Sequence, residues 1–186
     1  MGDGTYYSDS PFATVNVTTK ADAGSVTWTS VGNDVTLVTP GEYVVVYLMN
    51  ADKGDGYYYL PNPRADAAGA VVSKPLTIVS ADGSTLDASG VTEDMVWNFI
   101  TSGAGFSVQS AADNTVYLGA ANSNNGLRVG SYSTQVWAVA ADQTYNLTFL
   151  NSTMSRYLCA YTATNWRTYK SVTNNFGKLY LFKKGN

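Results

Sequence analysis

A Tyr-Leu pair occurs three times along the chain, at Tyr59-Leu60, Tyr117-Leu118 and Tyr157-Leu158, each time within the pattern of a β-hairpin. A unit of a few short strands cannot bury its own apolar face, so three such units must share a single core. The recurrence therefore predicts an all-β protein built from an internally repeated module.

Three segments, about 41–101, 102–141 and 142–186, each contain four short strand-like runs separated by Gly, Asn, Asp or Ser. The first segment is the loosest because it has two long loops, 61–69 and 82–94. We predict strands at 43–48, 57–60, 76–79 and 96–100, then 105–109, 115–119, 127–129 and 135–139, then 145–150, 156–161, 166–169 and 179–182.

Residues 1–40 lie outside this scheme. Runs at 13–18, 25–29 and 34–39 indicate two or three further strands. About forty residues alone would be marginally stable. We therefore expect an N-terminal β extension over residues 1–40, packed against one domain over residues 41–186.

The charge of the chain is low and unevenly distributed. Charged residues make up 13% of the 186 residues, about half of the usual share, while 45% are apolar. Residues 1–113 carry 13 acidic and 4 basic residues, whereas residues 114–186 carry 1 acidic and 7 basic residues. This asymmetry can steer an anionic ligand toward the C-terminal part. The bases form no stripe, so we expect no nucleic-acid partner.

The residues that catalysis usually needs are scarce. The chain has no histidine, and Cys159 is its single cysteine, so thiol catalysis and a cysteine- or histidine-rich metal site are disfavoured. Glu42 and Glu93 are the only glutamates, and nothing in the pattern selects a pair of carboxylates for glycoside hydrolysis. We expect a non-catalytic protein without a cofactor or metal.

No apolar run approaches the length that would cross a membrane, so we expect no membrane insertion. Residues 1–25 lack a basic region followed by an apolar stretch. We expect a protein that is secreted or held at a bacterial cell surface, its export signal already removed.

The repeats resemble the β-trefoil fold, in particular ricin B-type lectin modules, over roughly residues 41–186. Those modules close each repeat with Gln-x-Trp, which Gln135-Val136-Trp137 matches; Trp97 follows Met95-Val96 instead, and the third repeat has Lys178-Leu179-Tyr180. The segments 117–130 and 165–169 are also similar to modules in secreted proteins of gut bacteria. This resemblance implies a carbohydrate or host-surface setting.

Sugar recognition needs an aromatic face together with fixed amide, carboxylate or guanidinium groups. Strand alternation places Trp166 and Thr168 on one face of a hairpin and Arg167 and Tyr169 on the other. Trp166 is either the stacking ring or a core residue. The candidate sugar-binding residues of the third repeat, with a weaker set from the second, are Tyr161, Asn165, Trp166, Arg167 and Tyr169, then Asn125, Arg128 and Tyr132.

A glycan-binding, lectin-like module that serves attachment or substrate capture is thus the preferred function, with a polysaccharide or glycoprotein as partner. A structural or adhesive module that binds a surface protein is the first alternative. A proteinase inhibitor is the second, because Kunitz-type inhibitors resemble the same fold and present a basic residue on a loop, for which Arg64 and Lys74 are the candidates.

Overall fold

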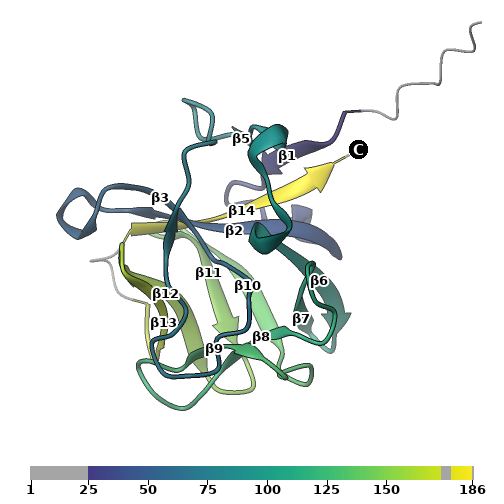
Figure 1. The fold of residues 1–186 in the computed structure, drawn as a ribbon, viewed down its shortest axis with the longest axis vertical. Helices are drawn as coiled ribbons and strands as arrows, with labels where there is room; N and C mark the ends of the chain where they lie inside the picture. Colours follow the sequence, from purple (N-terminus) through teal and green to yellow (C-terminus); the bar gives the residue numbers. More distant parts are fainter. Residues whose placement is uncertain (1–24, 173–176, 186) are drawn as a thin grey trace, which may run out of the picture.

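The computed structural model describes residues 25–172 and 177–185, which form strands and short 3-10 turns. Figure 1 shows their arrangement. The strands are β1 (Thr27–Ser30), β2 (Gly41–Met49), β3 (Gly56–Tyr59), β4 (Lys74–Pro75), β5 (Thr85–Leu86), β6 (Val96–Ser102), β7 (Gly105–Ser110), β8 (Tyr117–Ala120), β9 (Leu127–Gly130), β10 (Trp137–Asp142), β11 (Asn146–Asn151), β12 (Arg156–Thr162), β13 (Asn165–Tyr169) and β14 (Gly177–Gly185). The 3-10 turns are η1 (Val35–Leu37), η2 (Ala51–Lys53), η3 (Ala88–Gly90) and η4 (Glu93–Met95).

All fourteen strands belong to one antiparallel sheet, so the expectation of an all-β protein is confirmed. The central strand is β2, whose run of Val and Tyr is buried on both faces and pairs with β14, β6 and β3. The sheet continues from β6 through β7, β10 and β11. Near the start of β11 the chain meets β14, where the Leu179 amide donates to the Tyr145 carbonyl at 3.0 Å.

Three hairpins branch from this sheet: β3–β4, β8–β9 and β12–β13. The last two lie in the lower half of the view in Figure 1, away from β1 and β5. The hairpins also contact one another. Ala65, in the loop between β3 and β4, pairs with Val129 on β9, and the Trp166 amide on β13 donates to the Val71 carbonyl at 2.9 Å.

The core is rich in aromatic rings from several strands, among them Trp97, Phe99, Trp137 and Phe149. The Trp97 Nε1 donates to the Leu60 carbonyl at 2.9 Å, and the Trp137 Nε1 makes the same bond to the Leu118 carbonyl at 3.0 Å. The second residues of the first two Tyr-Leu pairs are thus each fixed by a buried indole.

Gln135, the first residue of the Gln-x-Trp match, has a structural role. Its side chain accepts from the Ala120 amide at 2.7 Å and donates to the Ala120 carbonyl at 3.0 Å. The Asn151 Nδ2 also donates to it at 2.7 Å. Met95 cannot make these bonds in the first segment; there, Asn62 donates from its own Nδ2 to the Glu93 and Val96 carbonyls. Both arrangements join a hairpin to the strand that follows it.

The described part of residues 1–40 contains one strand and one turn. β1 pairs with β14 and β5, and Trp28 packs in a second apolar cluster with Val44 and Phe182. The strand predicted at 34–39 is wrong. Asp34 accepts from the Thr36 amide at 3.0 Å, which favours the 3-10 turn η1 instead. The run at 13–18 lies outside the described residues.

The first segment differs from the prediction in three further places. The loop expected at 82–94 contains the short strand β5 and the turn η3. The strand expected at 76–79 is replaced by the two-residue β4, which ends at Pro75, a residue without an amide proton. The 61–69 loop is only partly a surface loop, because Pro61 and Asn62 are buried. None of the described residues forms a helix long and apolar enough to span a membrane.

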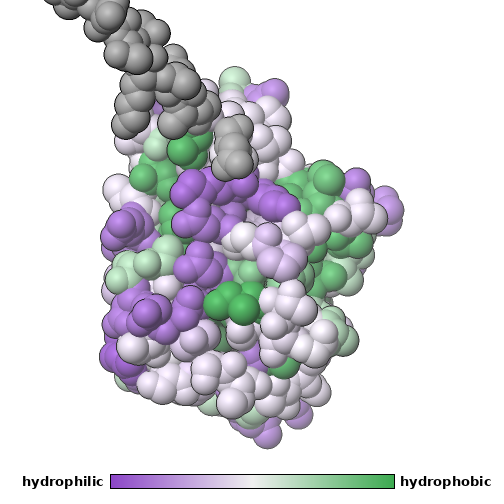
Figure 2. Space-filling model, turned by 90° about the vertical axis from the view of Figure 1, so that its right-hand side faces the viewer, coloured by the Kyte–Doolittle hydropathy of each residue, from purple (hydrophilic) through white to green (hydrophobic). Residues whose placement is uncertain are grey.

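The surface seen in Figure 2 carries a central area of hydrophilic residues, and its hydrophobic residues lie in separate groups.

Lys183 and Lys184, near the end of β14, line a pocket of about 290 Å³ with Thr29, Val31 and Leu37. Both lysines are already engaged, Lys183 with the Leu37 carbonyl and Thr39, Lys184 with Glu42. This pocket therefore offers no unpaired lysine to a ligand.

Candidate functional site

The register of the β12–β13 hairpin determines which side chains share a face. Tyr157 lies opposite Tyr169, Cys159 opposite Arg167, and Ala160 opposite Trp166, and an irregularity follows between Ala160 and Thr162. Along β13 partly buried residues alternate with buried ones, and Trp166 and Thr168 are the buried pair. The predicted division of this strand into two faces is confirmed.

Trp166 is a core residue, with 1% of its surface exposed. Its Nε1 donates to the Tyr59 carbonyl at 3.0 Å, and its ring meets the Tyr47 ring edge-on at 5.7 Å between centroids. No face of the indole is open to a ligand, which corrects the expectation that Trp166 stacks on a sugar. Of the two roles open to it from the sequence, the structure favours the core role.

The opposite face of the hairpin gathers the other predicted residues of the third repeat. The Arg167 guanidinium carbon lies 3.6 Å from the centre of the Tyr161 ring, and the Arg167 Nε donates to the Asn165 Oδ1 at 3.0 Å. Tyr169 also bonds to Arg167. We call the surface formed by Tyr157, Tyr161, Asn165, Arg167 and Tyr169 the third-hairpin face.

The third-hairpin face is open to solvent in part. Tyr161 is 36% exposed, and the other four residues are half-buried. Burial raises the pKa of the Tyr169 hydroxyl, although the hydrogen bond from Arg167 and its charge act in the opposite direction. Tyr169 therefore stays a neutral phenol at ordinary pH, and Arg167 is the charged group of the face. Cys159, on the same face in register, is fully buried and a packing residue.

Sequence reasoning missed Tyr157 as a member of this face. The Tyr-Leu pair itself indicated the position of Tyr157, because successive side chains of a strand point to opposite faces. If the leucine of a pair points into the core, the tyrosine points to the other face. Leu60, Leu118 and Leu158 are all buried. What the sequence lacked was the partner strand, since the pairing of Tyr157 with Tyr169 depends on the hairpin register.

Arg128 occupies the same register on the second hairpin, opposite Gly119, that Arg167 occupies opposite Cys159. Its surroundings differ. The Arg128 Nη1 donates to the carbonyls of Asn125 and Leu127 at 2.6 and 2.8 Å. Tyr132 lies directly over Gly119, so closely that a Cβ there would meet the ring at 2.2 Å. The chain itself thus covers part of this face.

A buried arginine on β12 donates hydrogen bonds to the Asn-rich loop of the second repeat, residues 122–126. Arg156, 3% exposed, donates to the Asn122 Oδ1 and the Asn124 Oδ1, both at 3.0 Å. Asn125 pairs with Thr168 on β13. The structure therefore uses these asparagines to dock the loop on the third hairpin. Burial raises the pKa of the Tyr132 hydroxyl and the nearby charge of Arg128 acts to lower it, but no contact found among the described residues joins either of them to Arg167.

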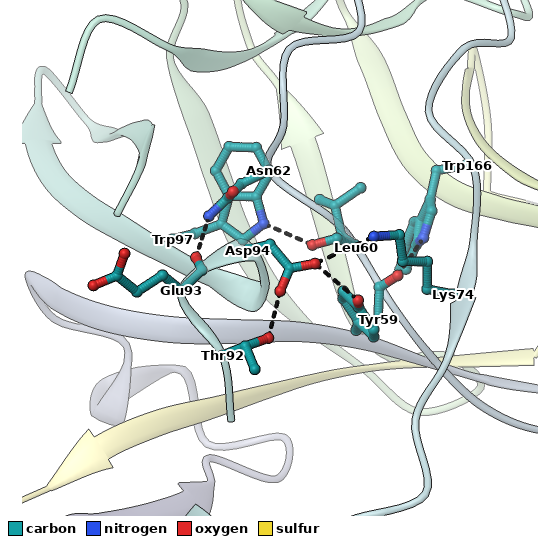
Figure 3. Close-up of polar contacts among 9 residues, drawn as sticks. All are labelled: Tyr59, Leu60, Asn62, Lys74, Thr92, Glu93, Asp94, Trp97 and Trp166. Carbon is teal, nitrogen blue, oxygen red and sulfur yellow. Dashed lines mark hydrogen bonds and ion pairs between the residues drawn. The ribbon is translucent and has the colours of Figure 1, made fainter. Parts of the chain in front are cut away.

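The candidate inhibitor residues of the first segment are both in ion pairs. The Arg64 Nη1 lies 2.9 Å from the Asp66 carboxylate, and the Lys74 Nζ lies 3.2 Å from Asp94. Asp94 also accepts bonds from Thr92 and from the Tyr59 hydroxyl (Figure 3). Burial, the bond to Asp94 and its charge raise the pKa of Tyr59 to about 12. This network joins Tyr59 on β3 and Lys74 on β4 to the turn η4.

Replacing Asp94 by asparagine should destabilise the protein in a pH-dependent way. Burial alone would raise the pKa of Asp94, but hydrogen bonds from Thr92, Tyr59 and Lys74 hold it below its ordinary value of 3.8. The contribution of the ionised Asp94 carboxylate to stability is therefore present above pH 3.8 and is lost as the pH falls through the pKa of the folded state. We expect Asp94→Asn to lose about 1 kcal/mol of unfolding free energy at neutral pH and almost nothing at roughly pH 2.

Urea unfolding of both proteins at the two pH values checks this. The matched control is Glu93→Gln, because the Glu93 side chain is exposed and, among the described residues, only the backbone carbonyl of Glu93 accepts a hydrogen bond. An equal loss for Asp94→Asn at both pH values would contradict the assigned charge interactions.

No three or more His, Cys, Asp or Glu residues in the described ranges lie close enough together to hold a metal ion. No family model matches the chain, and no match is found among curated proteins. What the protein does must therefore be inferred from its own geometry.

Proposed function

We propose that the chain is a β-trefoil-like, lectin-like module that binds glycans without catalysis, through the third-hairpin face. It would act outside the cell or at a cell surface, in attachment or in the capture of a substrate for a partner enzyme. The primary site is Arg167 with Tyr157, Tyr161, Asn165 and Tyr169. The residues of the second hairpin are not part of the proposed site, because Arg128 donates to its own backbone.

Strand pairing supports the trefoil part of the proposal. Strands β2, β6, β7, β10, β11 and β14 follow one another in contact, and the bond between Leu179 and Tyr145 would close them into a barrel. The three hairpins would then cap one end of it, which leaves few exposed sheet edges. The matching indole bonds of Trp97 and Trp137 fit such a repeat. In the third repeat the buried Leu179 would take the place of these indoles, one residue before Tyr180, which the sequence aligns with them.

The observation that carries the functional proposal is the fixed position of Arg167 on a partly exposed aromatic face. Its plane is stacked on Tyr161 and its Nε is held by Asn165. Aromatic surface beside a few fixed polar groups is what a sugar ligand needs. Because these contacts exist within one hairpin, little side-chain freedom remains to be lost on binding.

A glycan array probed with wild type, Arg167→Ala and Arg128→Ala tests the proposal. We expect wild type to bind a defined class of glycan, and Arg167→Ala to lose about tenfold or more in affinity, since charge-assisted hydrogen bonds are the strong ones. Arg128→Ala removes the same charge at the equivalent register and should bind within about twofold of wild type. Circular dichroism confirms that each variant is folded.

Two results would contradict the proposal. Equal binding by Arg167→Ala and wild type would remove the third-hairpin face as the site. No binding by folded wild type to any glycan would favour the other class of function, an adhesive module with a protein partner.

A further inference from the structure

The way in which Arg167 is held determines which of its atoms a ligand can reach. One face of the guanidinium lies on the Tyr161 ring, and its bonds in the structure go to Asn165 and Tyr169. An arginine has five N–H donors, more than these two contacts use. Those donors lie in the guanidinium plane, where they match the paired oxygens of a carboxylate or sulfate.

The charge around Arg167 is not neutralised by the described part of the chain. Arg64 has Asp66, Lys74 has Asp94, and Lys184 has Glu42, whereas the ion pairs of the described residues include none with Arg167. The only acidic residue after position 113 is Asp142, whose carboxylate accepts from the amides of Thr144 and Tyr145. An ordered cation with no carboxylate partner among the described residues is suited to bind an anionic group of a ligand.

The aromatic surface of the third-hairpin face also favours an anionic ligand. The guanidinium covers one side of the Tyr161 ring at 3.6 Å, so that side is closed to the apolar face of a neutral sugar. The cross-strand pair Tyr157 and Tyr169 remains as the aromatic surface next to the cation. A sugar ring placed there would bring a substituent of its own to the guanidinium edge.

We propose that the ligand of the third-hairpin face is an acidic glycan, whose carboxylate or sulfate ester is bound by the Arg167 guanidinium while a sugar ring lies against Tyr157 and Tyr169. This inference rests on the glycan binding proposed above and narrows it to one chemical class. Binding is non-covalent, and both anions present the paired oxygens that the guanidinium edge matches.

Two pairs of polymers, each with the same sugar backbone and with or without the anionic group, distinguish the sources of the anion. Polygalacturonate is compared with its fully methyl-esterified form, and dextran sulfate with dextran, by affinity electrophoresis and by biolayer interferometry of the full chain. Preference for polygalacturonate over its ester by about tenfold or more assigns a carboxylate. The same preference for dextran sulfate over dextran assigns a sulfate. Either result supports the inference.

Three variants separate a specific site from general attraction to a polyanion. Arg167→Ala should lose about tenfold or more in affinity for the anionic polymer. Arg167→Lys should recover only part of that loss, because an ammonium group cannot make the paired hydrogen bonds of a guanidinium. The affinity of Arg128→Ala should stay within about twofold of wild type. Equal losses for Arg167→Ala and Arg128→Ala would overturn the inference, since diffuse charge would explain them.

Binding of neutral glycans in preference to both anionic polymers would also overturn it, while the proposed glycan-binding function would stand. Failure of every glycan, neutral or acidic, to bind the folded protein would contradict both. Neutral glycans bind in the first outcome and do not bind in the second. Their binding therefore distinguishes failure of this inference from failure of the proposed function.

Discussion

Trp166→Ala should lower the free energy of unfolding by about 3–5 kcal/mol, the usual cost of removing a large buried aromatic side chain. The indole is 1% exposed and lies between two parts of the first segment, Tyr47 on β2 and the Tyr59 carbonyl. Its loss leaves a cavity and removes the hydrogen bond to that carbonyl. The change equals a large fraction of the total stability of a typical domain.

Because Trp166→Ala could fail to fold, Trp166→Phe provides a milder variant. It keeps most of the ring volume and loses the Nε1 bond, so we expect a loss of about 1–3 kcal/mol in urea denaturation. The matched control is Tyr161→Ala on the opposite face of the same hairpin, which should lose about 1 kcal/mol or less with its cation–π contact. A larger loss for Tyr161→Ala than for Trp166→Phe would show that the two faces are reversed.

Gln135→Leu should cost about 2–4 kcal/mol, although leucine is close to glutamine in size. The variant leaves three buried partners without the side chain that bonds them: the amide and the carbonyl of Ala120 and the side chain of Asn151. Each buried polar group without a partner costs about 1–3 kcal/mol, and local relaxation recovers part of the sum. Urea denaturation at neutral pH measures the change.

Gln143→Leu is the control for Gln135→Leu. Gln143 is exposed in the turn between β10 and β11, so the same substitution there should change stability by about 0.5 kcal/mol or less. Similar small effects at both positions would mean that the Gln135 bonds do not join the second hairpin to β10 in solution.

Local patterns were enough to predict most strands and the two faces of the third hairpin. Alternation separates Trp166 from Arg167 whatever the rest of the fold does. The equivalence of Arg128 and Arg167 also follows from matching the two segments around Tyr117 and Tyr157, and the register of both hairpins agrees with it.

The sequence did not reveal which face of that hairpin is buried. The answer depends on Tyr47 and Tyr59, more than 100 residues earlier in the chain, which contact Trp166. In the same way, the Asn-rich loop resembles a turn or a site until Arg156, from a later strand, is seen to bind Asn122 and Asn124. Contacts of this kind come from tertiary packing and leave no local pattern.

The two equivalent arginines differ in use because of their neighbours. The second hairpin has Gly119 and Gly130 on its outer side, where Tyr132 and the Asp66 carboxylate approach within a distance that no Cβ would allow. The third hairpin has Cys159 and Tyr169 at those places. In the second hairpin Tyr132 covers the residue opposite the arginine, whereas in the third hairpin Tyr161 and Tyr169 contact Arg167 and leave the face partly exposed. This difference is why the third hairpin is the proposed site.

The most direct test is an NMR titration of the ¹⁵N-labelled protein with trigalacturonate, followed by a neutral galactose trisaccharide. The account predicts shifts in the amides of β12 and β13 and in the Arg167 Nε–H signal, with a larger response to the acidic sugar. Shifts confined to the first hairpin or to the strands around β1 and β14, with Arg167 unmoved by either sugar, would contradict it.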